Sequence, residues 1–106
     1  MILARFLVGT DGTIQGFHVT GHAGMDESGK DVLCAFVSSA AYMTANTITE
    51  VIAARAEARA EDGEMYVRVS EEDAVKCSDV LKGFRLHLRQ TEEQYPECLK
   101  VIDTEV

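Results

Sequence analysis

A histidine and a cysteine, His22 and Cys34, stand twelve residues apart and flank a glycine-bearing segment. Thiolate is the nucleophilic form of cysteine, and an imidazole can accept the thiol proton and later protonate a leaving amine. Backbone N–H groups at the start of a helix can bind the oxyanion of an acyl-transfer intermediate. These residue types therefore allow acyl transfer, with Cys34 as the nucleophile and His22 as the general base and acid.

Spacing alone leaves other roles open for both residues. A cysteine in an alanine-rich helix is usually a small buried hydrophobe, so both side chains can instead serve packing. A metal-binding module would need a further ligand, and neither residue has a close-spaced partner, so we expect no metal and no cofactor. The sequence shows no evident third member of a triad, and the nearby acidic residues that can orient His22 are Asp26, Glu27 and Asp31.

The segments on either side of the pair predict how it is held. Residues 2–9 and 13–20 are β-like runs joined at Asp11-Gly12, a strong hairpin signal, so His22 follows the second strand. Residues 21–30 are a predicted loop, which we expect to close over a bound peptide as a lid. Glycine allows unusual backbone angles and close approach to a ligand, and the glycines of this loop are Gly21, Gly24 and Gly29.

A long helix is predicted after this loop, over residues 31–59, with Asp31 as its cap or in its first turn. Cys34 then lies in the first turn, where the helix N-terminus favours thiolate. Ser38 lies one turn later on the same face, either near the thiol or as a small residue that allows close packing. The remaining predicted elements are a charged helix tail ending at Gly63, a strand over 65–70, a helix over 72–94 opened by Ser70 and Asp73, and a last strand over 97–106.

The predicted order is β-β-α-β-α-β within a single domain, residues 1–106. Such an order indicates an α/β (α+β) sandwich, in which two helices pack on a four-stranded sheet. Hydrophobic residues make up 46% of the chain, which is enough for a core without metal or disulfide support.

The formal net charge of −8 argues against direct nucleic-acid binding, which needs a basic surface. It serves solubility and allows a basic partner. The start of the chain does not look like a signal peptide and no apolar run is long enough to span a membrane, so we expect a cytoplasmic protein without a membrane partner.

The segments "GHAG", "GKDVLCAFVSSA" and "TANTITEV" resemble the ribosomal-processing cysteine protease family of bacteria, Prp, and the likeness extends over the whole chain. The resemblance implies that His22 and Cys34 are the catalytic pair. It also implies that further positions match the motif around this pair, namely Gly21, Gly24, Gly29, Asp31 and Ser38, with Asn46 further along the helix. Met25 and Phe36 depart from residues common in the family and are expected to alter substrate fit rather than chemistry.

Proteins of this family are homodimers with an α/β sandwich fold. They remove an N-terminal extension from a large-subunit ribosomal protein, the twenty-seventh in the standard list, just after an aromatic-rich stretch. The resemblance therefore implies a basic ribosomal protein as substrate and a second copy of the chain as partner. The competing interpretation is a non-catalytic, ribosome-associated protein-binding module in which His22 and Cys34 only pack.

Overall fold

The computed structural model of the chain describes the backbone of residues 1–22 and 27–106 and the side chains of residues 1–22 and 32–106. Its elements follow the order β-β-α-β-β-α-β, with a π-helical turn after the first α-helix and a 3₁₀ turn before the second. In chain order they are β1 (Ile2–Val8), β2 (Ile14–Gly21), α1 (Glu27–Asn46), the π-helical turn (Thr47–Val51), β3 (Ala56–Glu61), β4 (Glu64–Val69), the 3₁₀ turn (Val75–Cys77), α2 (Ser78–Gln94) and β5 (Leu99–Glu105).

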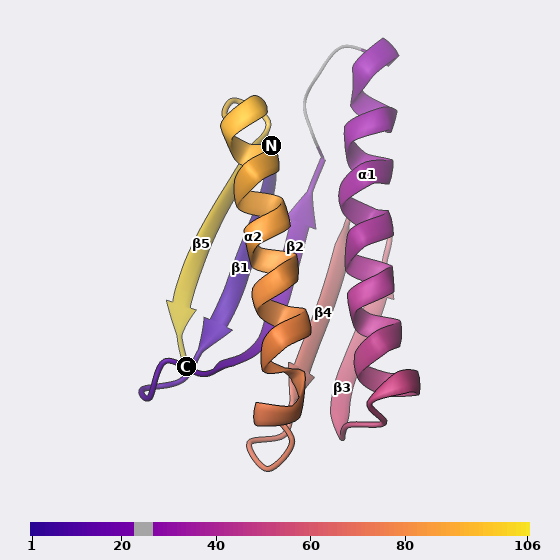
Figure 1. Cartoon of the computed structure of the whole chain (residues 1–106). Helices are drawn as coiled ribbons and strands as arrows, with labels where there is room; N and C mark the ends of the chain where they lie inside the picture. The colour runs from indigo at the N-terminus through magenta and orange to yellow at the C-terminus, as the bar shows by residue number, and fades with distance from the viewer. Residues whose placement is uncertain (23–26) are drawn as a thin grey trace.

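The five strands form one sheet in the order β3-β4-β2-β1-β5, and both helices lie on the same face of it (Figure 1). All neighbouring strands are antiparallel except β1 and β5, which run parallel. The predicted hairpin of the first two strands and the packing of two helices on the sheet are confirmed. The prediction of four strands is wrong, because an additional strand lies between α1 and β4.

This additional strand, β3, falls where the sequence predicts the tail of a long helix. Alanine, arginine and glutamate are strong helix formers, and their abundance here favours that interpretation. Alanine nevertheless alternates strictly with charge over 56–61, which is a strand period, and Asp62-Gly63 supplies a hairpin turn. β3 pairs with β4 through this turn, so pairing and turn outweigh local propensity.

The chain leaves α1 through an alanine in the left-handed region, Ala53, with φ +57°. The N–H of Ala54 donates to the carbonyl of Ile48 at 3.0 Å, which closes the helix end. Glycine usually occupies such a position. Because alanine stands here, the end of the helix cannot be recognised from the sequence. The helix therefore ends well before residue 59, and the chain is free to turn back into β3.

The second helix also begins later than predicted, at Ser78 instead of residue 72. Asp73, predicted to open the helix together with Ser70, instead accepts a hydrogen bond from the backbone N–H of Arg55 at 2.8 Å. This carboxylate therefore ties the turn before α2 to the chain entering β3. The predicted end of the helix is confirmed, since α2 stops at Gln94.

Three phenylalanines join the central strands to α2. The ring of Phe84 on α2 lies 5.5 Å from that of Phe6 on β1 and 4.9 Å from that of Phe17 on β2, both edge-on. Behind them the strands approach closely at Gly16, where a Cβ atom would collide with the backbone carbonyl of Val67 on β4. The core thus fills the space between the sheet and the two helices, and Cys77 is buried in it.

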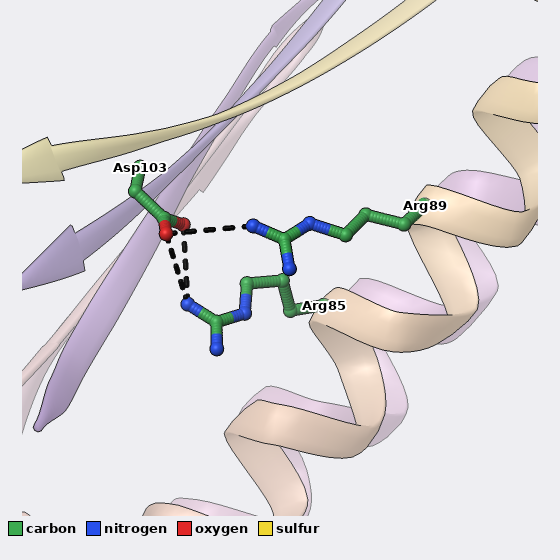
Figure 2. A network of polar contacts seen from close by, with 3 residues as sticks. All are labelled: Arg85, Arg89 and Asp103. Atoms are coloured by element: carbon green, nitrogen blue, oxygen red, sulfur yellow. Dashed lines mark hydrogen bonds and ion pairs between the residues drawn. The ribbon is translucent and has the colours of Figure 1, made fainter. Parts of the chain in front are cut away.

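Charge also ties α2 to β5. Asp103 on β5 contacts both Arg85 and Arg89, which lie one turn apart on α2 (Figure 2). Nη1 of Arg85 donates to the two carboxylate oxygens at 3.2 and 3.1 Å, and Nη2 of Arg89 donates to one of them at 3.4 Å. Partly exposed pairs of this kind contribute at most about 1 kcal/mol each, so they orient α2 more than they stabilise it.

Among the described residues, one helical stretch, Val32–Val51, is long and apolar enough to cross a membrane by length and composition, with a mean hydropathy of 1.3. It comprises most of α1 and the π-helical turn, and 28% of it is buried. One side packs on the sheet through Leu33, Val37, Ala41, Thr44 and Ile48. Other apolar side chains of the same stretch are exposed, among them Val32, Phe36 and Met43.

Candidate active site

A cavity of about 460 Å³ lies between α1, the sheet and the turn that joins β3 to β4. Its volume falls in the range typical of ligand sites, roughly 300 to 1,000 Å³. Both His22 and Cys34 line it. The other lining residues are Ile2, Val19, Gly21, Ala60 and Met65 from the strands, Val37, Ser38, Ala41 and Tyr42 from α1, and Glu61, Asp62, Gly63 and Glu64 from and beside the turn.

Gly21 sets the backbone immediately before His22. It ends β2 with φ +93°, and a Cβ atom there would collide with the backbone carbonyl of Met1. Its N–H donates to the carbonyl of Gly63 at 2.9 Å, which ties the end of β2 to the β3–β4 turn. Only glycine combines this backbone angle with this close approach, so the fold by itself requires glycine at position 21.

The imidazole of His22 lies against that same turn. A Cβ atom built on Gly63 would be 3.1 Å from Nε2 and 3.4 Å from Cε1 of His22. His22 is otherwise exposed. The ring is thus held at the rim of the cavity, where solvent and a substrate can both reach it.

Cys34 lies on the wall that α1 contributes. It is half-buried and packs against the core. Ser38 lines the cavity one turn further along, and Ala41 and Tyr42 follow after a further turn. The predicted shared face of Cys34 and Ser38 is therefore observed, and this face borders the cavity.

The predicted position of Cys34 in the first turn of its helix is wrong. α1 begins at Glu27, so Asp31 is not its cap and Cys34 lies about two turns inside the helix. Amide groups at that depth bond within the helix, and the helix dipole acts mainly within the terminal turn. The free N–H groups at the start of α1 therefore lie well before Cys34, and the predicted oxyanion site at the helix start does not adjoin this residue.

The predicted loop over residues 21–30 is shorter than expected, because residues 27–30 belong to α1 and Gly29 is helical. Gly24 and Met25 lie outside the described residues, as do the side chains of Asp26, Glu27 and Asp31. The lid and the acidic partner of His22 therefore stay predictions.

Two other predicted residues lie away from the cavity. Asn46 is the last residue of α1, and its distance from Cys34 along the helix axis is about 18 Å. Phe36 stacks on His87 of α2, with ring centroids 5.0 Å apart, and lines a separate groove between the helices. Substitution at Phe36 is thus not expected to alter substrate fit directly.

Sequence reasoning missed the acidic wall of the cavity. Glu61, Asp62 and Glu64 line it at the β3–β4 turn, but the carboxylate of Glu64 lies on the other face of the sheet, where it contacts Nε2 of His18 at 2.9 Å. The signals that identify this wall are the alternation over 56–61 and the dipeptide Asp62-Gly63.

The thiol of Cys77 and the potential metal ligands among the described residues differ from the pair at this cavity. Burial, and secondarily the carboxylate of Asp73, raises the pKa of the Cys77 thiol, which keeps it protonated and unreactive. Within residues 1–22 and 32–106, no three histidine, cysteine or acidic side chains gather closely enough to hold a metal ion. The cavity is therefore bordered by a cysteine, a histidine and an acidic turn.

The sequence of this chain matches a known protein family. The family described as cysteine protease Prp matches residues 1–100. No protein of curated function matches the chain by sequence.

Several solved structures share its fold. The ribosomal processing protease Prp of S. aureus with a covalently linked product peptide superposes with a TM-score of 0.87 at 24% identity, covering 98% of this chain and 100% of that one. The same protease with a substrate peptide gives 0.86 at 23% identity, with the same coverage. SMU.848 of Streptococcus mutans gives 0.83 at 20% identity, covering 100% of this chain and 99% of that one. Because the family match spans nearly the whole chain, this protein is a cysteine-type peptidase and belongs to the Prp family.

Proposed function

We propose that this peptidase removes the N-terminal extension of a large-subunit ribosomal protein, the twenty-seventh in the standard list, with Cys34 as nucleophile and His22 as general base and acid. One observation carries the assignment of residues: the thiol-bearing wall of α1 and the imidazole after β2 border the same cavity. The S. aureus relative, described as a ribosomal processing protease, supports the class of substrate.

The proposed mechanism follows from these two side chains. His22 accepts the proton of the Cys34 thiol while Sγ attacks the scissile carbonyl carbon. The C–N bond then breaks, and the leaving amine takes the proton from His22, which leaves a thioester on Cys34. Water, deprotonated by His22, attacks the thioester, and the released thiolate recovers the proton.

The lining of the cavity fits a basic peptide with apolar residues before the cut. Ile2, Val19 and Met65 provide an apolar floor, while Glu61 and Asp62 are exposed acidic residues at the β3–β4 turn that borders the cavity. Acidic groups near a cleft attract a cationic substrate and raise its local concentration. Ribosomal proteins are basic, so the charge of the cavity supports this substrate class.

Mass spectrometry of the extended ribosomal protein after incubation tests the proposal directly. We expect one new N-terminus immediately after the aromatic-rich stretch, and no product with Cys34→Ala or His22→Ala. Cys98→Ala is the matched control, because Cys98 is also half-buried and packed against the core but does not line the cavity. Cleavage by Cys34→Ala at the wild-type rate, or equal loss in Cys98→Ala, would refute the assignment of the nucleophile.

The same proposal includes a homodimer in the cytoplasm. Two features support the dimer: exposed Phe36 and Met43, and a groove of about 580 Å³ between α1 and α2 that both residues line. Large exposed apolar patches commonly mark interaction surfaces, and a second copy of this face is the partner that we assign.

The oligomeric state in solution tests this part separately. Light scattering is expected to give twice the mass of the chain for the wild type and a monomer for Met43→Glu. Val75→Glu serves as control, since Val75 is also an exposed apolar residue but lies on the 3₁₀ turn outside this groove. A wild-type monomer at micromolar concentration would exclude the proposed dimer.

A further inference from the structure

The β3–β4 turn meets His22 through a single residue, Gly63. Its carbonyl accepts the N–H of Gly21 at 2.9 Å, directly before His22 in the chain. Its Cα lies beneath the imidazole, so that a Cβ atom there would be 3.1 Å from Nε2 and 3.4 Å from Cε1. The turn thus bonds to the backbone that leads into His22 and leaves no room for a side chain beside the distal edge of its ring.

Carbon atoms in ordinary contact lie about 3.5 to 4.0 Å from their neighbours. A side chain at residue 63 would therefore displace the ring of His22 by some tenths of an ångström, or force it into another rotamer. His22 is exposed, so among the described residues little other packing opposes a shift of its ring. The bare Cα of Gly63 is what leaves room for the observed ring position.

A second turn in the same protein separates this role from the ordinary role of a turn glycine. Gly12, between β1 and β2, has φ +85°, close to the φ +75° of Gly63. No described atom lies within 4 Å of a Cβ atom built on Gly12. The two glycines therefore share the backbone requirement, and of the two only Gly63 has an imidazole above it.

We infer that Gly63 is a positioning residue for peptide cleavage: it sets the place of the His22 imidazole relative to Cys34 through the room above its Cα and through its carbonyl. The inference rests on the proposed function, in which His22 transfers the proton. The β3–β4 turn thereby gains a role in catalysis that is separate from the roles of His22 and Cys34.

Four variants test it, namely Gly63→Ala, Gly63→Asn, Gly12→Ala and Gly12→Asn. Asparagine tolerates positive φ far better than alanine but still carries a Cβ atom, so it removes most of the backbone strain and keeps the contact with His22. We expect kcat to fall about tenfold in both Gly63 variants, because displacements below 1 Å carry penalties of this size, while KM changes little. Both Gly12 variants are expected to keep the wild-type kcat.

The second readout is the rate of Cys34 alkylation by iodoacetamide as a function of pH. A purely structural loss leaves the shape of this profile unchanged. Displacement of the imidazole is expected to move the Gly63→Asn profile toward that of His22→Ala, with Gly12→Asn matching the wild type.

The outcomes distinguish this inference from the proposed function. If His22→Ala is inactive and Gly63→Asn cleaves at the wild-type rate, the positioning role is wrong and the function of His22 stands. If His22→Ala cleaves normally, the proton-transfer role fails and the inference fails with it. Equal losses of kcat in the Gly63 and Gly12 variants would also overturn the inference.

Discussion

Replacement of Ala53 by glycine is expected to stabilise the protein. Ala53 has φ +57°, a left-handed conformation that costs a non-glycine residue about 1 to 2 kcal/mol. Glycine avoids this cost but loses about 0.5 to 1 kcal/mol more backbone entropy on folding. With both costs at the middle of their ranges, the difference is a gain of about 0.75 kcal/mol in the free energy of unfolding for Ala53→Gly. For a chain of this length, that gain raises Tm by about 3 to 6 °C.

Urea and thermal unfolding measure this change, and Ala35→Gly provides a control of opposite sign. Ala35 is exposed in the interior of α1, where glycine destabilises a helix by about 1 kcal/mol. Peptidase activity of Ala53→Gly is expected to remain at the wild-type level, because Ala53 does not line the cavity. If both glycine variants lose stability equally, the left-handed helix end at Ala53 is wrong.

Three further predictions concern the site and the core. In peptide kinetics, Ser38→Ala is expected to lower kcat/KM several-fold, because Ser38 lines the cavity. Ser39→Ala, whose side chain does not line it, is the control and should leave kcat/KM unchanged. Equal kcat/KM values in the two variants would show that Ser38 is not part of the site. The double change Glu61→Gln with Asp62→Asn should lower kcat/KM for a basic peptide several-fold at low salt, and the loss should shrink near 0.5 M salt because mobile ions screen exposed charges; a salt-independent loss would contradict an electrostatic role. Burial raises the pKa of Cys77, so the folded thiol stays neutral while the unfolded thiol ionises above about pH 8.5. This contribution to stability is complete below that pH and is lost as pH rises. The free energy of unfolding in urea should therefore fall less between pH 7 and pH 10 in Cys77→Ala than in the wild type. Equal falls would rule out Cys77 as the cause.

The parts of the fold that the sequence predicts well are those in which several local signals agree. The β1–β2 hairpin combines apolar runs with Asp11-Gly12, and the end of α2 precedes Tyr95-Pro96, where helix is disfavoured. The missed strand, β3, is built on alanine, so its composition favours helix while its period favours strand. Tertiary pairing with β4 decides between them, and pairing of distant residues leaves little local signal.

The site was predicted in the same uneven manner. Residue chemistry and the family motif direct attention to His22 and Cys34, and both border one cavity. The start of α1 could not be located from Asp31, because acidic and small residues before it are also compatible with a first helical turn. The acidic turn at Glu61 and Asp62 was missed along with β3, because this turn exists only if residues 56–61 form a strand and the sequence was interpreted as helix there.

The parallel pairing of β1 with β5 has a consequence for biosynthesis. β1 is the first strand to be made and β5 is the last, yet they are neighbours in the sheet. During synthesis, one edge of β1 therefore remains unpaired until the final strand is available, and Phe6 stays uncovered until Phe84 arrives on α2. Contacts between such distant residues form slowly because long loops must close first. Every described residue that lines the cavity of His22 and Cys34 lies before α2, so the whole of this lining is synthesised before the helix and the strand that complete the core.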